Sequence, residues 1–325
     1  MKIAFFDAHG FEKKFYTNMS EQHELDFFEF RLDEKSVSLI ENYDIVCVFV
    51  NDHLNDRIIQ KLSEQGVKAV VLRCAGYNNV DLEAAKKYDL PVLRVPYYSP
   101  HSVAEHAVAL MLCLNRKIHK AYYRMKDLNF SLDGLMGMDI FGKTVGVIGC
   151  GNIGKCFAKI MKGFSANVLV SDPHIDQEVS AFASYVAIEE LLESSDIISL
   201  HAPLNPQTLH LIDKDAFSRM KEHVLLINTS RGGLIDSKAL LQALKLKKIG
   251  GAALDVYEEE ENVFFENLSD DGLQDDVLAR LLTFPNVLVT SHQAFLTTEA
   301  LENIAKITLD NINAVKNKTE FINQL

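Results

Sequence analysis

Short apolar runs rich in Val, Ile, Leu and Phe alternate with helical patterns along almost all of the 325 residues. In the first third of the chain, these runs predict five strands, at KIAFFDA, LDFFEF, DIVCVFV, KAVVLRC and PVLRVP. From Lys143 onward they predict six more, at KTVGVIG, NVLVSD, DIISLHA, VLLINTS, IGGAALDV and NVLVTS. Strands that alternate with helices indicate βαβ units and hence parallel sheets. We therefore expect an α/β protein with two doubly wound parallel sheets.

Two helical patterns indicate how these sheets divide the chain, which is longer than one hydrophobic core usually supports. Residues 102–125 are apolar on more than one helical face, which predicts burial inside the protein or against a second subunit. The last helical pattern is amphipathic, and Thr297 or Thr298 can serve as its N-cap. Because this helix follows the final strand, it can return to the first sheet. We therefore expect a flavodoxin-like domain of residues 1–100 and 297–325, with a domain of residues 101–296 inserted into it.

Composition narrows the range of partners and compartments. The formal net charge of -12 disfavours nucleic acids and anionic membrane surfaces, which leaves a small molecule as the expected substrate. The N-terminus does not resemble a secretory signal, and the longest apolar run, Ala107 to Leu114, is far shorter than the roughly 20 residues of a membrane span. The five cysteines form no CxxC or Cys/His pair at metal spacing. We therefore expect a cytoplasmic protein with reduced cysteines and no metal.

Three glycines at GxGxxG spacing follow the first strand of the second series, in VGVIGCGNIG. Gly149 permits a tight turn, Gly151 lets a pyrophosphate approach the backbone, and Gly154 lets helix and strand pack closely. The next strand ends at Asp172, where a carboxylate accepts hydrogen bonds from the adenosine ribose and repels a 2′-phosphate. A glycine-rich turn that binds nothing is the weaker alternative. Residues 101–296 are therefore expected to form a Rossmann domain that prefers NAD to NADP.

Polar side chains follow three later strands of the same series. They are Arg231 after VLLINTS, the Glu258–Glu261 run after GGAALDV, and His292 after VLVTS. Because the carboxyl ends of parallel strands share one edge, we expect these side chains to converge beside the glycine loop. Reduction of a 2-oxo acid needs a guanidinium fork for the carboxylate and an imidazole to protonate the alkoxide. It also benefits from a carboxylate that favours the imidazolium.

The pattern leaves two assignments open. His201 also ends a strand on this edge, and the residues around it separate it from His292 only weakly. The stretch from Glu258 to Asp276 is strongly acidic and has no Lys or Arg, which is typical of a solvated loop. Taken singly, Arg231, a loop glutamate and His292 are each more often structural than catalytic. Their joint position beside a dinucleotide loop favours the catalytic interpretation.

Over essentially its whole length, the sequence resembles the D-isomer-specific 2-hydroxyacid dehydrogenase family. The resemblance rests on GCGNIG with SDP, HAPLNPQT, NTSRGGLID, ALDVYEEE and SHQAF, in the family's order and spacing. It implies that Arg231 binds the substrate carboxylate, and that His292, rather than His201, is the acid/base paired with Glu260. It further implies an NAD site made by Gly149, Gly151, Asn152, Ile153, Gly154, Asp172, His201, Pro203, Thr229, Ser230 and Asp255.

The resemblance also implies substrate contacts in both domains. LRCAGYNNVD resembles the family's substrate loop, in which backbone amides of Ala75 and Gly76 would hold the carboxylate. VPYYSP matches a VPxYSP pattern, which makes Tyr98 a substrate-facing residue. Phe295, at the end of HQAF, would form the wall beside the substrate methyl group.

Within the family, HQAF and the acidic insert with FFEN and LQDDVLARL are most similar to the fermentative branch that reduces pyruvate to D-lactate with NADH. It implies that the substrate is a small 2-oxo or 2-hydroxy acid. The long apolar helix from Ser102 predicts at least a dimer, a homodimer or homotetramer, because a lone subunit would expose too large an apolar patch. The net charge disfavours nucleic-acid and membrane partners. One alternative is a dehydrogenase for longer side chains, of the 2-hydroxyisocaproate type. Another is an NAD-sensing binding protein similar to a corepressor, which the complete set of Arg231, Glu260 and His292 disfavours.

Overall fold

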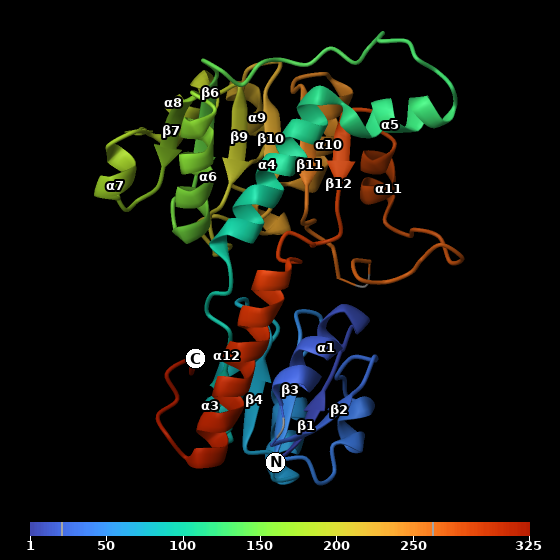
Figure 1. The fold of residues 1–325 in the computed structure, drawn as a ribbon, viewed down its shortest axis with the longest axis vertical. Coiled ribbons are helices and arrows are strands. Elements are labelled where there is room, and N and C mark those ends of the chain that lie inside the picture. Colours follow the sequence, from blue (N-terminus) through green and yellow to red (C-terminus); the bar gives the residue numbers. More distant parts are fainter. Residues whose placement is uncertain (21, 262) are drawn as a thin grey trace. The chain divides into compact units, whose positions relative to one another are not determined.

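The computed structural model describes residues 1–20, 22–261 and 263–325. The chain divides into two compact units, one of Met1–Ser99 with Leu296–Leu325 and the other of Pro100–Phe295 (Figure 1). Each unit contains a wholly parallel sheet flanked by helices, so the predicted fold class is confirmed. The C-terminal helix α12 (Thr298–Asn317) belongs to the first unit, which makes the second unit an insertion in the first.

The first unit is built on a five-stranded sheet in the order β2-β1-β3-β4-β5, which is the flavodoxin-like order. The strands are β1 (Lys2–Phe5), β2 (Glu24–Phe27), β3 (Ile45–Val48), β4 (Ala69–Leu72) and β5 (Val92–Leu93). Ile3 and Ile45 of this sheet share a core with Leu309 of α12 and with Tyr16 of α1 (Gly10–Met19). The remaining helices of this unit are η1 (Ser36–Leu39), α2 (Asp56–Glu64) and α3 (Leu82–Lys87).

Side-chain caps fix where several of these helices begin. Asn55 accepts a hydrogen bond from the Ile58 amide at the start of α2. At the start of α12, Thr297 accepts from the Ala300 amide, so Thr297 is the N-cap and Thr298 is the first helical residue. Such a cap is worth about 1 kcal/mol to a helix. The short polar residue before each apolar helical pattern therefore sets the boundary that the pattern alone leaves uncertain.

The second unit contains a seven-stranded sheet in the order β12-β11-β10-β9-β6-β7-β8. The strands are β6 (Thr144–Ile148), β7 (Asn167–Ser171), β8 (Ser184–Tyr185), β9 (Ile197–Leu200), β10 (Leu225–Asn228), β11 (Gly251–Leu254) and β12 (Val287–Val289). Six of them were predicted, and β8 was missed because it is only 2 residues long. The order reverses between β6 and β9, and open α/β sheets bind ligands at such a reversal.

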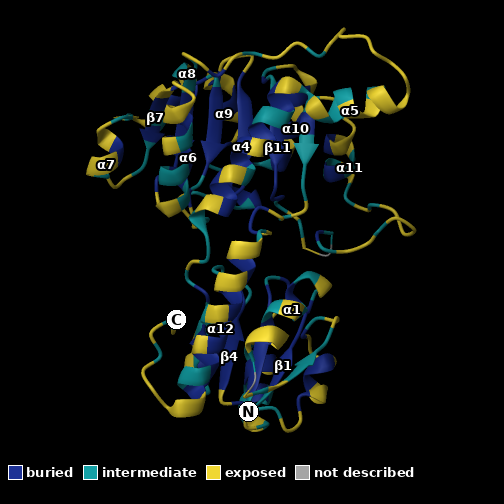
Figure 2. Cartoon of the chain, viewed as in Figure 1, coloured by how far each residue is buried: buried dark blue, intermediate teal, exposed yellow. Residues whose placement is uncertain are grey.

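Helices cover both faces of this second sheet, as the buried strands in Figure 2 show. On one face, α4 (Pro100–Arg116) and α6 (Asn152–Gly163) share a core with Val145 and Ile227. The opposite face packs against α8 (Ile188–Ser194), α9 (Lys214–Arg219), α10 (Ser237–Lys245) and α11 (Asp276–Leu282). The short α7 (Gln177–Ser180) and η2 (Gly232–Leu234) also belong to this unit.

The helix predicted over residues 102–125 is two helices, α4 and α5 (Ile118–Lys126). Lys117 between them has a φ of 53°, and this left-handed conformation cannot continue an α-helix. The apolar faces of α4 are largely buried inside the unit, whereas α5 has no buried residue (Figure 2). Large apolar side chains are exposed on α5 and on the segment after it: Ile118, Tyr122, Tyr123, Met125, Leu128, Phe130, Leu132, Met136 and Phe141.

Candidate active site

One row of hydrogen-bonded neighbours crosses the second sheet just before its strands end. The row consists of Ser171, Ile148, Leu200, Asn228, Leu254 and Val289. Because all these strands are parallel, the residues that follow the row lie along one edge of the sheet. Those residues include most of the predicted site: Asp172, Gly149, His201, Arg231, Asp255 and His292. The register therefore brings together side chains that are far apart in the sequence.

The three loop glycines are required for different reasons. Gly149 has a φ of 86°, and a Cβ there would lie 2.5 Å from the Ala202 amide nitrogen. A Cβ on Gly154 would lie 2.1 Å from the Gly149 carbonyl oxygen, so helix α6 could not pack so closely. A Cβ on Gly151 would meet nothing within 4 Å. The protein itself gives no reason for a glycine at position 151, which agrees with a pyrophosphate that approaches the backbone there.

Asp172 lies directly beside this loop. One carboxylate oxygen accepts from the Cys150 amide at 2.6 Å, and the other accepts from the His174 amide at 2.7 Å. The side chain remains 15% exposed at the end of β7, where a ribose can reach it. An open glycine turn, the first turn of α6 and a held carboxylate are the features that a dinucleotide needs. The residues present therefore fit NAD.

His292 is hydrogen-bonded to Glu260, whose Oε1 lies 2.8 Å from the imidazole Nδ1. The second carboxylate oxygen, Oε2, accepts from the Tyr257 amide at 2.9 Å, which fixes the carboxylate in place. The neighbouring Glu258 is engaged elsewhere, 2.5 Å from His210 Nε2. The structure thus pairs Glu260, rather than Glu258, with the histidine of HQAF. Because Nδ1 is taken up by Glu260, Nε2 is the imidazole nitrogen left for a substrate.

Arg231 is brought close to this pair by the glycine that follows it. A Cβ on Gly232 would lie 2.0 Å from the Tyr257 carbonyl carbon, so the two backbone segments are in direct contact. The Asn228 side chain donates to the Arg231 carbonyl oxygen at 2.9 Å and holds the turn after β10. The guanidinium donates one hydrogen bond to the Ser230 carbonyl oxygen at 2.7 Å and is partly exposed.

His201 has a different environment from His292. Its Nε2 lies 2.9 Å from Ser199 Oγ, and its ring packs on Phe157. Burial lowers the pKa of His201 to about 3, so the ring is neutral near pH 7. Among the contacts of the described residues, none pairs it with a carboxylate. His201 is therefore a poor proton donor, and the geometry favours His292 as the acid.

The other predicted NAD contacts are placed along the same edge, and their roles stay predictions. Asn152 and Ile153 lie in the first turn of α6, and Pro203 is exposed beyond β9. Ser230 donates to the Ala202 carbonyl oxygen at 2.7 Å, and Thr229 is buried. Asp255 also ends a strand at this edge, but its side chain has no exposed surface.

Two residues that contact Asp255 were not predicted from the sequence, Thr290 and His106. Thr290 directly precedes SHQAF, which is the only signal that could have drawn attention to it. His106 lies on α4, and no motif relates it to the end of β11.

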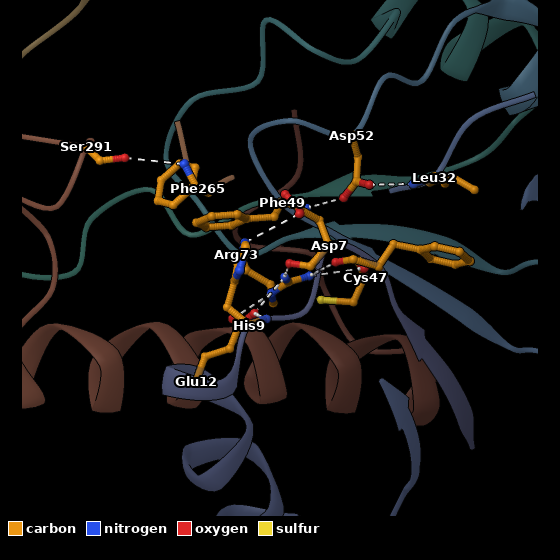
Figure 3. Close-up of polar contacts among 11 residues, drawn as sticks. Asp7, His9, Glu12, Leu32, Cys47, Phe49, Asp52, Arg73, Phe265 and Ser291 are labelled. Carbon is orange, nitrogen blue, oxygen red and sulfur yellow. Dashed lines mark hydrogen bonds and ion pairs between the residues drawn. The ribbon is translucent and has the colours of Figure 1, made fainter. Parts of the chain in front are cut away.

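The predicted substrate loop lies in the first unit, after β4. It includes Arg73, a fully buried residue whose five N–H groups all have acceptors (Figure 3). The guanidinium makes two bonds to Glu12, at 3.0 and 2.9 Å, and the others to backbone carbonyls at the ends of β1 and β3. Farther along, Arg94 donates to the Ala75 carbonyl oxygen at 2.8 Å, beside Gly76.

Tyr98 and Phe295 lie next to the two points where the chain passes between the units. The Tyr98 carbonyl oxygen accepts from Asn303 of α12 at 2.8 Å, and its ring is partly exposed. Phe295 is the last residue of the second unit and is 8% exposed. Their contacts with a substrate stay predictions.

Comparison with known proteins agrees with this site. A family model described as D-isomer specific 2-hydroxyacid dehydrogenase, NAD binding domain, matches residues 108–294. The chain belongs to the D-isomer-specific 2-hydroxyacid dehydrogenase family, a family of NAD-dependent oxidoreductases. It is 48% identical over 319 residues to a 2-hydroxyacid dehydrogenase homologue of Haemophilus influenzae, covering 97% of this chain and 96% of that protein.

Relatives with a more specific name are equally similar. The chain is 47% identical over 328 residues to the D-lactate dehydrogenase of Escherichia coli, covering 100% of both proteins. The solved apo-structure of D-lactate dehydrogenase from Escherichia coli matches with a TM-score of 0.92 and 45% identity, again over 100% of both chains.

The sequence also predicts a protein without a membrane span, a metal site or disulfides. Within the described residues, no helix has both the length and the apolar character of a membrane span. In the same part of the chain, no group of His, Cys, Asp and Glu side chains is arranged to hold a metal ion. All five cysteines are free.

Proposed function

We propose that this protein reduces pyruvate to D-lactate with NADH in the cytoplasm. The observation that carries the proposal is the His292–Glu260 pair at 2.8 Å, on the sheet edge that also holds Arg231 and the glycine loop. The similarity to D-lactate dehydrogenases supports the choice of substrate. A fermentative role would follow from this direction of reaction.

Arg231 binds the substrate carboxylate in this proposal. A guanidinium can meet both carboxylate oxygens at once, which orients the substrate as well as holding it. The backbone amides of Ala75 and Gly76 stay predicted contacts of the substrate. When NADH is bound, with its pyrophosphate at the glycine loop, its nicotinamide would supply the hydride. The chain's own task is then to bind, orient and protonate.

His292 delivers the proton to the oxygen of the 2-oxo group. Its Nδ1 is bonded to Glu260, so the proton must come from Nε2. Glu260 is itself held by the Tyr257 amide, so the imidazole keeps its orientation while the alkoxide charge develops. His201, neutral and without a carboxylate partner in the contacts described, cannot replace it.

Asp172 sets the preference for NAD over NADP. Both of its oxygens accept hydrogen bonds from backbone amides, which holds the carboxylate at the position expected for the ribose. A 2′-phosphate would be placed against this negative charge. Comparison of the Kd values of NADH and NADPH by calorimetry tests this; equal affinities would contradict it.

A self-associating protein is supported by the exposed apolar surface of α5 and the segment after it. Leu128, Leu132 and Met136 are 76%, 81% and 87% exposed, and they form part of one continuous segment. Exposed apolar patches of this kind mark interfaces in soluble proteins. We expect a homodimer or homotetramer by sedimentation velocity at micromolar concentration. A monomer that remains stable at that concentration would refute this expectation.

One experiment separates the possible activities. NADH oxidation is measured with pyruvate, 2-oxobutyrate and 2-oxoisocaproate, and the chirality of each product is determined. The highest kcat/KM with pyruvate, with D-lactate as product, is the expected result. A preference for 2-oxoisocaproate would point to the longer-chain alternative. The measurement is needed because one methylene alters selectivity by only about 1–3 kcal/mol, a difference that a few pocket residues can produce. NADH binding without turnover of any acid would point to an NAD-sensing binding protein.

A further inference from the structure

A buried carboxylate lies behind the proposed acid residue. Oδ1 of Asp255 accepts from the Thr290 hydroxyl at 2.5 Å and from the Gln293 amide at 2.9 Å, and Oδ2 accepts from the Ala294 amide at 2.9 Å. Burial raises the pKa of this carboxyl, but hydrogen bonds from His106, Thr290 and the two amides outweigh it and lower the pKa overall. Asp255 is therefore an anion at neutral pH, and the groups that bond to it are held in place.

The segment held in this way includes His292. The His292 amide donates to the Asp255 carbonyl oxygen at 2.7 Å, so three successive amides, from His292 to Ala294, all end on Asp255. His292 has a φ of 48°, which residues with a side chain rarely adopt. The same residue must direct its ring to Glu260. Bonds that maintain this backbone conformation therefore help to set the direction of the imidazole.

His106 completes the set of groups around Asp255. Its Nε2 lies 3.2 Å from Thr290 Oγ1 and 3.3 Å from Asp255 Oδ1. The Thr290 hydroxyl proton is already donated to Asp255, so Thr290 can only accept from His106. Nε2 of His106 must therefore carry a proton, which it shares between the two oxygens. The side chain of His106 is 18% exposed, so this donor is largely shielded from water.

The same carboxylate links the two ends of the second unit. Helix α4 starts at Pro100, the first residue of the unit, and carries His106 in its second turn. The HQAF segment ends at Phe295, the last residue of the unit. Both segments lead directly to connections with the rest of the chain. The shared Asp255 carboxylate therefore ties the backbone around His292 to helix α4.

We propose that His106 and Thr290 are positioning residues for His292, acting through the Asp255 carboxylate to hold the backbone of residues 292–294. The inference rests on the proposed function, because it concerns the acid residue of that reaction. Neither His106 nor Thr290 touches the reacting groups. Their effect is on the angle and distance at which the His292 proton is offered.

Three variants and one control test this proposal. His106→Leu removes the N–H donor and keeps an apolar side chain, whereas His106→Gln keeps a donor that can reach the same oxygens. Thr290→Val removes the hydroxyl at nearly constant volume. The matched control is His23→Leu, which removes a partly buried histidine whose Nε2 lies 3.0 Å from Asn313 Oδ1 in the first unit.

The expected result is a loss of turnover without a loss of binding. In His106→Leu and Thr290→Val, kcat for pyruvate should fall about tenfold or more, while KM and the NADH Kd stay within about threefold. The solvent deuterium isotope effect on kcat should increase, because transfer from a displaced imidazole limits the rate. His106→Gln should retain kcat within about threefold of the unmodified protein. His23→Leu should leave kcat and the isotope effect unchanged.

Amide hydrogen exchange gives a test that does not depend on activity. A peptide covering residues 287–297 should exchange faster in His106→Leu and in Thr290→Val than in the unmodified protein, His106→Gln or His23→Leu. Folded variants with unmodified kcat and unmodified exchange would overturn the proposal. Equal losses of kcat in His106→Leu and His106→Gln, with an unchanged isotope effect, would assign a merely structural role and also overturn it. If the unmodified protein does not reduce any 2-oxo acid, the proposed function fails instead, and the exchange data still decide whether the anchor exists.

If His106→Leu does not fold, Thr290→Val provides the same readouts. The threonine contributes one hydroxyl to the anchor, and valine fills the space that it leaves. Unmodified turnover and exchange in that variant would overturn the proposal equally.

Discussion

Two glycine-to-alanine substitutions in the same loop are expected to affect different properties. Gly154→Ala should destabilise the fold, whereas Gly151→Ala should weaken NADH binding. At Gly154, a Cβ would lie 2.1 Å from the Gly149 carbonyl oxygen, so the strand and α6 must move apart. Overpacking of this kind costs about 1–3 kcal/mol, which lowers the melting temperature of a domain this size by roughly 2–12 °C. At Gly151, φ is -68° and ψ is -163°, which alanine adopts readily, and a Cβ meets nothing within 4 Å.

The Gly151→Ala variant should therefore fold normally and bind NADH poorly. Its free energy of unfolding should change by less than about 1 kcal/mol, whereas its NADH Kd should rise tenfold or more, about 1.4 kcal/mol of binding free energy. Differential scanning calorimetry measures the first quantity and titration calorimetry the second. If Gly151→Ala binds NADH as tightly as the unmodified protein, the open space at that position has no role in cofactor binding, which would refute the prediction.

Four further variants address the remaining parts of the site and the fold. Arg231→Lys should lower kcat/KM about a hundredfold, with a higher KM and a lower kcat, because one ammonium cannot meet both carboxylate oxygens; near-normal steady-state kinetics would remove Arg231 from the site. Glu260→Gln should lower kcat about tenfold or more at unchanged NADH affinity, while Glu258→Gln should not; the reverse order in kinetic assays would mean the wrong glutamate was assigned. Arg73→Met should cost about 3–5 kcal/mol in urea unfolding, since it leaves a buried carboxylate unpaired, and a loss below about 1 kcal/mol would contradict this. The pKa of His201 falls from 6.5 to about 3 on folding, so its contribution to stability is complete above pH 6.5 and is lost as the pH falls toward 3. Between pH 6.5 and 5 this loss is about 2 kcal/mol, and His201→Asn should remove it; parallel stability curves for the two proteins would refute the assignment.

The sequence alone allowed the strands to be predicted, together with the sheet edge that carries the candidate site. Apolar runs identified every strand of the first sheet and six of the second, because buried parallel strands have a strong local pattern. The parallel arrangement then placed Arg231 and His292 on one edge without knowledge of the register. The strand β8 was missed because 2 residues carry no pattern, and the break at Lys117 was missed because no proline or glycine marks it.

The surroundings of the acid residue were harder to predict. Which glutamate pairs with His292 depends on the turn from Tyr257 to Glu260, in which an amide holds the carboxylate, and the run of four glutamates does not reveal it. The resemblance to the family named Glu260, and the geometry supplies the reason. His106 could not be predicted at all, because its contact with Asp255 arises only when α4 packs across the sheet. Local patterns predict elements, whereas contacts between distant side chains depend on how those elements pack.

The most direct test of the account compares the unmodified protein with His292→Gln. With pyruvate and NADH, the unmodified protein should form D-lactate, and His292→Gln should lose turnover by at least about a thousandfold while its NADH Kd stays within about threefold. His201→Gln, measured in parallel at saturating NADH, should retain most of its turnover, because His201 is at most a contact of the cofactor. Loss of turnover in His201→Gln, with activity kept in His292→Gln, would contradict the assignment of the His292–Glu260 pair as the acid of the reaction.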